Sequence, residues 1–302
     1  CAWDECALAA AGAPARIFGD VSMPGTVLGG LTADVQARVG FNAQVMLPAT
    51  HDTGSAFLAV PACDEDAVYL SSGTWSLLGV EHEGPITSDA SRFQNFTNEG
   101  GYLKRYRFLK NIMGLWLIQE CRREWQKAGM NYSWDEIVAE ADRAEPFRSL
   151  IDPDYGDFYA GGRMVEKIQE FCRRTRQPIP QTVGQIARCI YESLALKYRW
   201  ALERLEEIKG QRIGTLNIVG GGCKNRLLNQ FVANAINRPV IAGPVEGAAI
   251  GNLLVQAMAL GDIRSMEELR SIVRHSESVE EYRPNHAVQW EKSSAFLQKL
   301  LK

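Results

Sequence analysis

The sequence predicts an α/β fold, and three segments of the chain indicate it most clearly. Within about fifty residues, 215–262, a buried strand, a glycine turn, a helix, a second strand and a second helix follow one another, an order typical of layered α/β domains. Residues 67–80 form a strand, a tight turn and a return strand rich in aromatic and branched side chains. A long amphipathic helix begins after Thr182 and continues to Ile208.

Length and composition are those of a globular protein. The chain has 302 residues, of which 46% are hydrophobic and 23% charged, and its length allows about two domains. These values exclude a disordered chain, a collagen-like chain and a coiled-coil rod. The net charge of −3 gives no electrostatic reason to expect nucleic acid or an anionic membrane as partner. No apolar run of about 18 residues, the length that spans a bilayer, occurs.

The amino terminus and the cysteines bear on the extent of the chain and on its cellular compartment. The chain begins with Cys1 and shows no signal peptide, so we expect a part of a longer chain. The cysteines are odd in number and include no C-x-x-C pair, which favours reduced, mostly buried thiols and a cytoplasmic location. Cys172 and Cys189 could meet in space, and whether they form a disulfide stays open. The seven cysteines are Cys1, Cys6, Cys63, Cys121, Cys172, Cys189 and Cys223.

The first half of the chain predicts short elements punctuated by turns. Tyr106–Leu109 leads into a helix whose apolar face runs from Ile112 to Trp125. Before it we expect a short helix at 32–38, a buried strand at 44–47, one or two helical turns at 55–60, strands at 67–70 and 75–80 around a turn at 71–74, and a turn cluster at 95–101.

The second half predicts longer elements with clear ends. Thr182 caps the long helix, and Gly210 stops it. The charged tail from residue 263 ends in an amphipathic helix near 293–301. The other expected elements are a helix start at 133–136, a strand at 216–219, a helix at 225–236, a strand at 239–242 and a helix at 246–260.

Two turns could hold phosphate groups. Gly220-Gly221-Gly222 joins a strand to a helix and would let backbone N–H groups approach a nucleotide. It is neither a dinucleotide fingerprint, because Asn225 replaces the last glycine, nor a P-loop, because Gly-Lys never occurs. The hairpin tip at 71–76 offers hydroxyl and N–H donors to phosphoryl oxygens. Each turn could equally be a packing turn or an ordinary hairpin.

Asp52 is the candidate proton acceptor. It follows a predicted strand, at the edge of a sheet where α/β folds bind ligands, and a carboxylate there can accept the proton of an attacking hydroxyl. Asp52 could instead cap the helix that follows. A serine hydrolase is disfavoured because no G-x-S-x-G motif occurs. Adjacent His51 and Asp52 side chains are also expected to point apart on an extended backbone.

Taken together, these motifs resemble those of the FGGY carbohydrate kinases. Their order and spacing agree from about residue 15 to residue 262, and collinear motifs are more specific than any one alone. The matching stretches are HDTGSA at 51–56, YLSSGTWSL at 69–77, TNEGG at 97–101, LKNIMGLW at 109–116, and VGGGCKNRLLNQ at 219–230 followed by VIAGPVE at 240–246.

The resemblance implies two actin-like, ribonuclease H-like domains with a cleft between them. We expect this chain to hold the end of the N-terminal, sugar-side domain at 1–62 and the C-terminal, nucleotide-side domain at 63–302. The rest of the N-terminal domain carries a phosphate loop, an acidic residue near the metal and part of the sugar pocket. We therefore expect this chain alone to be a poor kinase that still binds ATP weakly.

The resemblance also implies the reaction and its residues. The motifs are most similar to those of family members that transfer the γ-phosphoryl group of ATP, with Mg²⁺, to the 1-hydroxyl of L-rhamnulose. Asp52 would be the base, with His51, Thr53 and Asn111 as further sugar contacts. Gly73 and Thr74 would hold the β- and γ-phosphates, and Gln119, Gly221 and Asn225 would lie near the nucleotide. The sequence assigns no metal ligand.

Two alternatives remain at this point. Another ketose, such as L-fuculose or xylulose, could be the acceptor. The chain could also be a nucleotide-binding module without catalysis, acting as a sensor or scaffold. The sequence predicts no oligomeric state.

Overall fold

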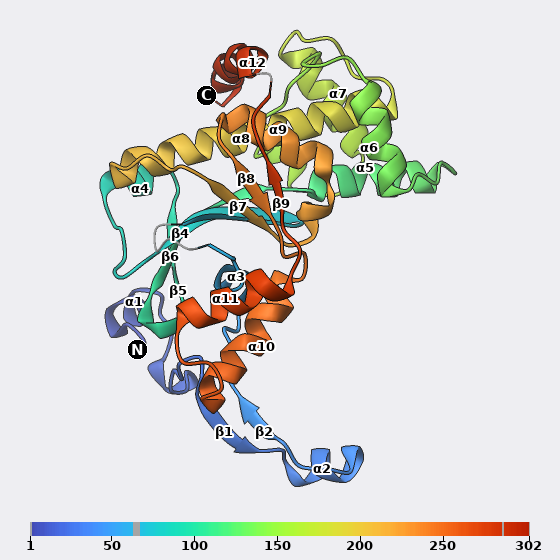
Figure 1. Cartoon of the computed structure of the whole chain (residues 1–302). Helices are drawn as coiled ribbons and strands as arrows, with labels where there is room; N and C mark the ends of the chain where they lie inside the picture. The colour runs from blue at the N-terminus through green and yellow to red at the C-terminus, as the bar shows by residue number, and fades with distance from the viewer. Residues whose placement is uncertain (1, 63–66, 286, 302) are drawn as a thin grey trace.

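The computed structural model describes residues 2–62, 67–285 and 287–301. A seven-stranded mixed sheet, in the order β5-β6-β4-β3-β7-β8-β9, forms its centre (Figure 1). The strands are β3 Val68–Ser72, β4 Trp75–His82, β5 Thr97–Gly100, β6 Tyr106–Met113, β7 Leu216–Val219, β8 Val240–Ala242 and β9 Glu280–Tyr282. The predicted α/β fold is therefore confirmed. The predicted boundary between residues 62 and 63 adjoins 63–66, which lie outside the described residues, as do Cys1 and Cys63.

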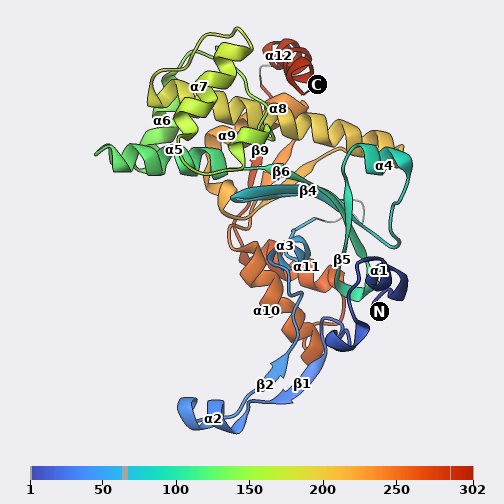
Figure 2. The same ribbon diagram turned by 180° about the vertical axis from the view of Figure 1, so that it is seen from behind.

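Helices cover both faces of this sheet. On one face lie α5 Trp116–Lys127, α6 Trp134–Arg143, α7 Met164–Arg174, α8 Val183–Lys209, α9 Arg226–Ile236 and α12 Ala287–Leu300. On the other lie α3 Asp52–Leu58, α10 Gly247–Leu260 and α11 Met266–Ser276 (Figure 2). Other short helices include α1 Glu5–Ala10 and α4 Asp89–Phe93. No helix among the described residues is both long and apolar enough to cross a membrane.

The central strands are buried on both sides, which explains their nearly continuous apolar sequence. Val68 and Leu70 of β3 pack into the large core under α8 and α9. Tyr69, between them, faces the opposite side and packs with Phe57 of α3. Because side chains alternate along a strand, one strand contributes to both cores and fixes α3 against the sheet.

The direction of the strands decides where a ligand can bind. β3 and β7 are parallel neighbours, with Ser71 opposite Val219, although about 150 residues separate them in the chain. β4 returns antiparallel to β3. The carboxyl ends of β3 and β7 therefore reach the same edge of the sheet, where ligands bind in open α/β folds.

The amino-terminal segment forms an arm outside the central sheet. β1 Val27–Gly30 pairs with β2 Gln44–Met46 in a separate two-stranded sheet, and α2 Ala33–Val39 connects them. The predicted helix and strand are both present, but the expectation that the strand is buried is wrong, because its residues are exposed or half-buried. A two-stranded hairpin standing away from the main body offers no second layer to cover it (Figure 1).

Two predictions in the middle of the chain are corrected. Residues 97–100, expected as a turn, form the edge strand β5, and Ile112, expected on a helix, lies in β6. β6 pairs with β4 over its whole length, from Trp75 opposite Met113 to His82 opposite Tyr106. A short apolar run fits a strand or a helix by periodicity alone, and here the long partner strand decided the outcome.

The predicted caps of the long helix are confirmed. Thr182 accepts a hydrogen bond from Gln185 N, and Gly210 adopts the left-handed conformation that ends α8. Ser133 likewise caps α6. Helices α7 and α11 and strand β9 were not predicted, and α12 begins before the predicted start at residue 293.

The described cysteines are free thiols, and four of them are buried as expected. Cys172 and Cys189 do meet, through a hydrogen bond between their thiols rather than a disulfide. This bond and burial raise the pKa of Cys189 well above its usual value. Cys6 is exposed, which the expectation of mostly buried thiols allows.

Candidate active site

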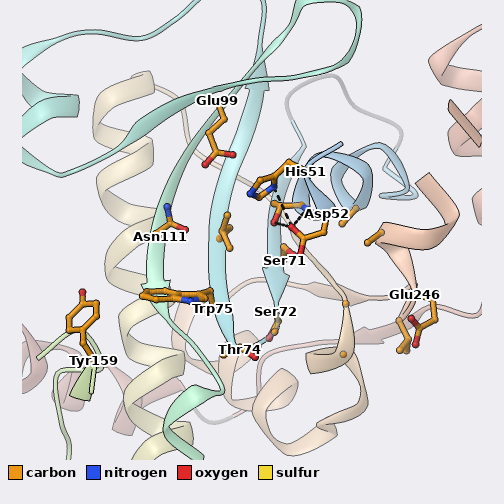
Figure 3. A pocket seen from close by; sticks show the side chains of 18 of the residues that line it. His51, Asp52, Ser71, Ser72, Thr74, Trp75, Glu99, Asn111, Tyr159 and Glu246 are labelled. Atoms are coloured by element: carbon orange, nitrogen blue, oxygen red, sulfur yellow. Dashed lines mark hydrogen bonds and ion pairs between the residues drawn. The ribbon is translucent and has the colours of Figure 1, made fainter. Parts of the chain in front are cut away.

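A pocket of about 850 Å³ opens at the carboxyl ends of β3 and β7 (Figure 3). It brings together side chains from α3, the β3–β4 turn, β6 and the glycine turn after β7. The predicted site residues that line it are His51, Asp52, Thr53, Gly73, Thr74, Asn111 and Gly221. Gln119 and Asn225 do not line it but lie behind its turns.

The first wall is the turn between β3 and β4. Cross-strand pairing of Ser72 with Ser76 leaves Gly73 and Thr74 at the tip. The carbonyl oxygens of both tip residues accept hydrogen bonds from the start of α5: Gly73 O from Leu115 N at 2.9 Å and Thr74 O from Trp116 N at 3.1 Å. The turn is therefore held from behind, on the side away from the pocket.

Gln119 acts on this turn through Thr74. The Thr74 hydroxyl donates a hydrogen bond to Gln119 Oε1 at 3.2 Å. Gln119 belongs to α5, which begins two residues after the glycine that follows β6. Gln119 thus contacts a hydroxyl that lines the pocket, and its predicted place near a nucleotide stays a prediction.

The second wall is the triple-glycine turn after β7. Gly220 has a φ of 91°, a conformation that glycine adopts at no steric cost. A Cβ added to Gly222 would lie 2.0 Å from Ser72 Oγ, so the two turns touch where β3 and β7 end. Asn225 caps α9, its Oδ1 accepting a hydrogen bond from Leu228 N at 3.0 Å. Its direct contact with a nucleotide stays a prediction.

The third wall carries the candidate base. His51 occupies the cap position of α3 and Asp52 is the first helical residue, so Asp52 is not the N-cap. Asp52 Oδ1 accepts hydrogen bonds from Thr53 N at 2.6 Å and Thr53 Oγ1 at 3.3 Å. The Asp52 side chain is 83% exposed, so its carboxylate is accessible from the pocket.

His51 and Asp52 do not point apart, contrary to the prediction. His51 Nδ1 lies 3.3 Å from Asp52 Oδ1. The prediction assumed an extended backbone on both sides, whereas the helix begins at Asp52 and turns its side chain back toward the preceding residue. The pair borders the pocket together (Figure 3).

Close packing fixes α3 and therefore Asp52. Ser55 Oγ donates to Ala49 O at 2.7 Å, which ties the helix to the segment before it. A Cβ on Gly251 of α10 would lie only 1.9 Å from Ser55 O. The backbones of α3 and α10 can approach this closely only because Gly251 has no side chain.

Several lining residues were not predicted as site residues. Trp75, Glu99 and Glu246 fall inside the motifs that carry the family resemblance, so their motifs were the signal. Asn95 and Tyr159 also line the pocket. Tyr159 comes from a loop far along the chain, and its ring centroid lies 6.0 Å from that of Trp75. No sequence pattern indicated that contact.

The charged groups of the pocket are mostly acidic. Asp52, Glu99 and Glu246 border it from three elements (Figure 3). Behind Glu99 lies Arg107, with Nη2 3.2 Å from Glu99 Oε2. Within the described ranges, no group of three or more His, Cys, Asp or Glu side chains is placed to hold a metal ion.

Comparison with known proteins identifies the relatives of this arrangement. Residues 68–260 match the model of the FGGY family of carbohydrate kinases, C-terminal domain. A rhamnulokinase of Bacteroides thetaiotaomicron is 47% identical over 94% of this chain and 58% of its own length. A rhamnulokinase of Halalkalibacterium halodurans is 43% identical over 93% of this chain and 59% of its own length. The chain thus spans less than two thirds of these relatives.

Solved structures show the same fold. The xylulose kinase of Rhodospirillum rubrum matches with a TM-score of 0.70 at 18% identity, over 98% of this chain and 59% of that one. The glycerol kinase of Plasmodium falciparum with ADP matches with a TM-score of 0.70 at 15% identity, over 99% of this chain and 59% of that one. These similarities confirm the predicted actin-like α/β fold.

Proposed function

Because the chain belongs to the FGGY family of carbohydrate kinases, we propose that it supplies the nucleotide side and the proton acceptor of an ATP-dependent kinase. The acceptor that we propose is L-rhamnulose, phosphorylated on its 1-hydroxyl. One observation carries this proposal: Asp52 and both phosphate-binding turns border a single pocket. About 150 residues separate the glycine turn from Asp52 and the β3–β4 turn, so the meeting of the three is a property of the fold.

Phosphoryl transfer needs positioning and charge stabilisation more than covalent chemistry from the protein. The Thr74 hydroxyl, if it turns from Gln119 Oε1 to the ligand, and backbone N–H groups of the two turns are donors suited to phosphate oxygens. Asp52 is the carboxylate suited to accept the proton of the attacking hydroxyl. His51 and Asn111 border the same space and would position the sugar beside Asp52.

The proposed cofactors are ATP and Mg²⁺. Mg²⁺ is usually bound through one or two carboxylates together with substrate phosphates, not by a protein cage. The Glu246 carboxylate on the pocket wall fits this pattern, with the nucleotide supplying the remaining ligands. When bound, the cation would neutralise charge on the β- and γ-phosphates. ATP as substrate and the buried thiols also favour the cytoplasm as the proposed location.

The choice of sugar rests on the relatives. Matches at 41% to 47% identity carry the name rhamnulokinase, whereas the xylulose kinases match at 18% identity or less and support the fold alone. We would assay the native, full-length protein with ATP, Mg²⁺ and a panel of ketoses, measuring ADP release. L-Rhamnulose should give the highest kcat/KM. A higher value for L-fuculose or xylulose would replace it as the acceptor.

We propose further that residues 1–62 belong to the sugar side and 63–302 to the nucleotide side, and that this chain alone is a poor kinase. The exposure of Asp52 supports the proposal of poor kinase activity, because an open site admits water in competition with the sugar. Rapid ADP release by the isolated chain in the presence of L-rhamnulose would contradict it. Calorimetry with ADP, beside the turnover assay, separates a kinase from a nucleotide-binding module without catalysis.

A further inference from the structure

A second carboxylate, Glu99, points into the pocket on the side of His51 and Asn111 (Figure 3). It lies on β5, and its side chain is 27% exposed. Its Oε2 atom is buried and accepts no hydrogen bond within the described part of the chain. Its nearest charged partner is Arg107 on β6, at 3.2 Å.

Arg107 is almost completely buried, with 4% of its surface exposed. Its Nη2 atom donates to Gly100 O at 3.1 Å and faces Glu99, while Nε and Nη1 make no hydrogen bond among the described residues. Burying an incompletely paired guanidinium is costly, so a position that was only structural would be filled better by an apolar side chain. Burial lowers the pKa of Arg107, and the charges of Glu99, Glu81 and Asp52 oppose that shift.

Three adjacent strands place these charges in one row. Glu81 of β4 lies directly opposite Arg107, and Arg107 lies directly opposite Glu99. At the far end of the row, Arg270 of α11 donates to Glu81 Oε2 at 2.9 Å. The row therefore alternates in charge from α11 to the pocket wall, and Glu99 is its one member that lines the pocket.

The guanidinium also lies directly under the helix that carries Asp52. A Cβ added to Gly54 of α3 would be 2.8 Å from Arg107 Nη1. Arg107 is thus packed between the base-bearing helix and Glu99, so it fixes the position of Glu99 relative to Asp52. Because Oε2 is buried against Arg107, the Glu99 oxygen that can meet a ligand is Oε1, and a carboxylate oxygen accepts hydrogen bonds from sugar hydroxyls more strongly than a neutral acceptor does.

We propose that Glu99 is a specificity-determining residue that accepts hydrogen bonds from hydroxyl groups of the ketose, and that Arg107 is the positioning residue that holds it. This inference rests on the proposed kinase function and deepens it. It assigns to β5 and β6 the recognition of the part of the sugar away from the reacting hydroxyl. Asp52 and the glycine turns are left to the chemistry.

The main test is Glu99→Gln in the native, full-length protein. The variant keeps the shape of the side chain and loses its charge. We expect KM for L-rhamnulose and its Kd by calorimetry to rise about 10- to 100-fold, as for loss of a charged hydrogen bond. We expect kcat to stay within about threefold and KM for ATP within about twofold, the pattern of lost binding shared by ground and transition states.

Glu206→Gln is the matched control. Glu206 forms a bidentate pair with Arg238 and does not line the pocket. Its loss removes the same charge from a comparable ion pair, so it should change thermal stability and leave both KM values unchanged. Ketoses that each lack one hydroxyl add a second readout: the wild type should reject at least one of them, and Glu99→Gln should lose that discrimination.

Arg107→Gln tests the positioning role. If Arg107 acts through Glu99, the double variant with Glu99→Gln should have a KM for the ketose no higher than Glu99→Gln alone. A folded Glu99→Gln protein with an unchanged KM for the ketose, or with equal losses toward ATP, overturns the inference.

The two proposals fail in different ways. Wild-type protein that binds or phosphorylates a ketose other than L-rhamnulose corrects the proposed function, and the same variants then test Glu99 with that ketose. Wild-type protein that binds no ketose in calorimetry overturns both. Additive KM effects in the double variant leave Glu99 as a ligand and remove Arg107 as its positioning residue.

Discussion

The two proposed sides of the pocket are formed by different kinds of residue. On the nucleotide side, glycine and hydroxyl residues form turns that touch each other, with a Cβ on Gly222 falling 2.0 Å from Ser72 Oγ. On the sugar side, ionisable side chains project from α3 and β5, and the carboxylate of Asp52 is 83% exposed. Phosphate groups are alike in every nucleotide, so backbone N–H groups suffice to bind them. Distinguishing one sugar from another requires side chains that can vary.

The largest expected effect lies on the sugar side. Asp52→Asn should lower kcat of the full-length protein by about 10²- to 10⁴-fold, because the amide cannot accept the proton of the attacking hydroxyl. Calorimetry should show unchanged affinity for ATP. Asp89→Asn is the control, because Asp89 is equally exposed at 83% and lies at the surface beside Arg92. Near-normal turnover by Asp52→Asn would remove Asp52 as the proton acceptor.

The next effect tests the rigidity of the nucleotide side. Gly222→Ala would force a methyl group against Ser72 Oγ and separate the two turns. We expect the Kd for ATP to rise at least about tenfold and the free energy of unfolding to fall by about 1–3 kcal/mol. Gly214→Ala is the control, because nothing lies within 4 Å of its added Cβ. Equal ATP affinity in both variants would show that contact between the turns is not required.

A smaller effect on ATP binding is expected from removing the hydroxyl of Thr74, which lies on the proposed nucleotide side of the pocket. Thr74→Val removes the hydroxyl that donates to Gln119 and should raise the Kd for ATP about 3- to 10-fold, the usual range for one neutral hydrogen bond. If Gln119 acts only by orienting Thr74, adding Gln119→Ala to Thr74→Val should cause no further loss. Additive losses in ATP titrations would indicate that Gln119 contacts the nucleotide itself.

A buried charge outside the pocket should affect stability alone. Burial raises the pKa of Glu192 to about 7, against the opposing effect of Arg188. The native state therefore holds this proton more tightly than the unfolded state, whose value is about 4.5. The contribution of Glu192 to the free energy of unfolding should fall as pH rises from about 4.5 to about 7, by at most about 1.4 kcal/mol per pH unit.

Glu192→Gln tests this expectation by removing the titration. Urea unfolding between pH 5 and pH 8 should give a flatter curve for the variant than for the wild type, with both KM values unchanged at pH 7. Parallel curves would mean that Glu192 does not titrate in this range in the native protein. Together with Glu99→Gln, the comparison distinguishes a buried carboxylate that stabilises the fold from one that binds substrate.

Local sequence signals predicted much of the fold because they act over a few residues. The Thr182 and Gly210 caps of α8 and the β3–β4 hairpin are each specified by residues that touch one another along the chain. The predictions that were wrong concern which segments are buried and which segments pair as strands. The strand at 44–46 lacked a covering layer, and Ile112 joined a strand because β4 lay beside it.

In the candidate site, too, some features follow from local sequence and others do not. The types of residue at 51–53, 73–74 and 220–222 are readable in the sequence, and the family motifs located them. The family resemblance implied that they share one site, but no local signal did, because their meeting requires β3 and β7 to lie parallel across about 150 residues of chain. The contact of Arg107 with Gly54 and the approach of Tyr159 to Trp75 likewise have no local signal.

The amino-acid sequence by itself determined the capped ends of α6 and α8, the β3–β4 hairpin and the residue types that stand at the ends of strands. Those properties depend on backbone preferences and on hydrophobic periodicity over roughly ten neighbours. The tertiary structure brought the candidate base Asp52, the two candidate phosphate turns and Glu99 to one pocket, with Arg107 behind Glu99. Their positions depend on how the helices pack on both faces of the sheet to bury its apolar side chains. That packing exists only once the whole chain has folded.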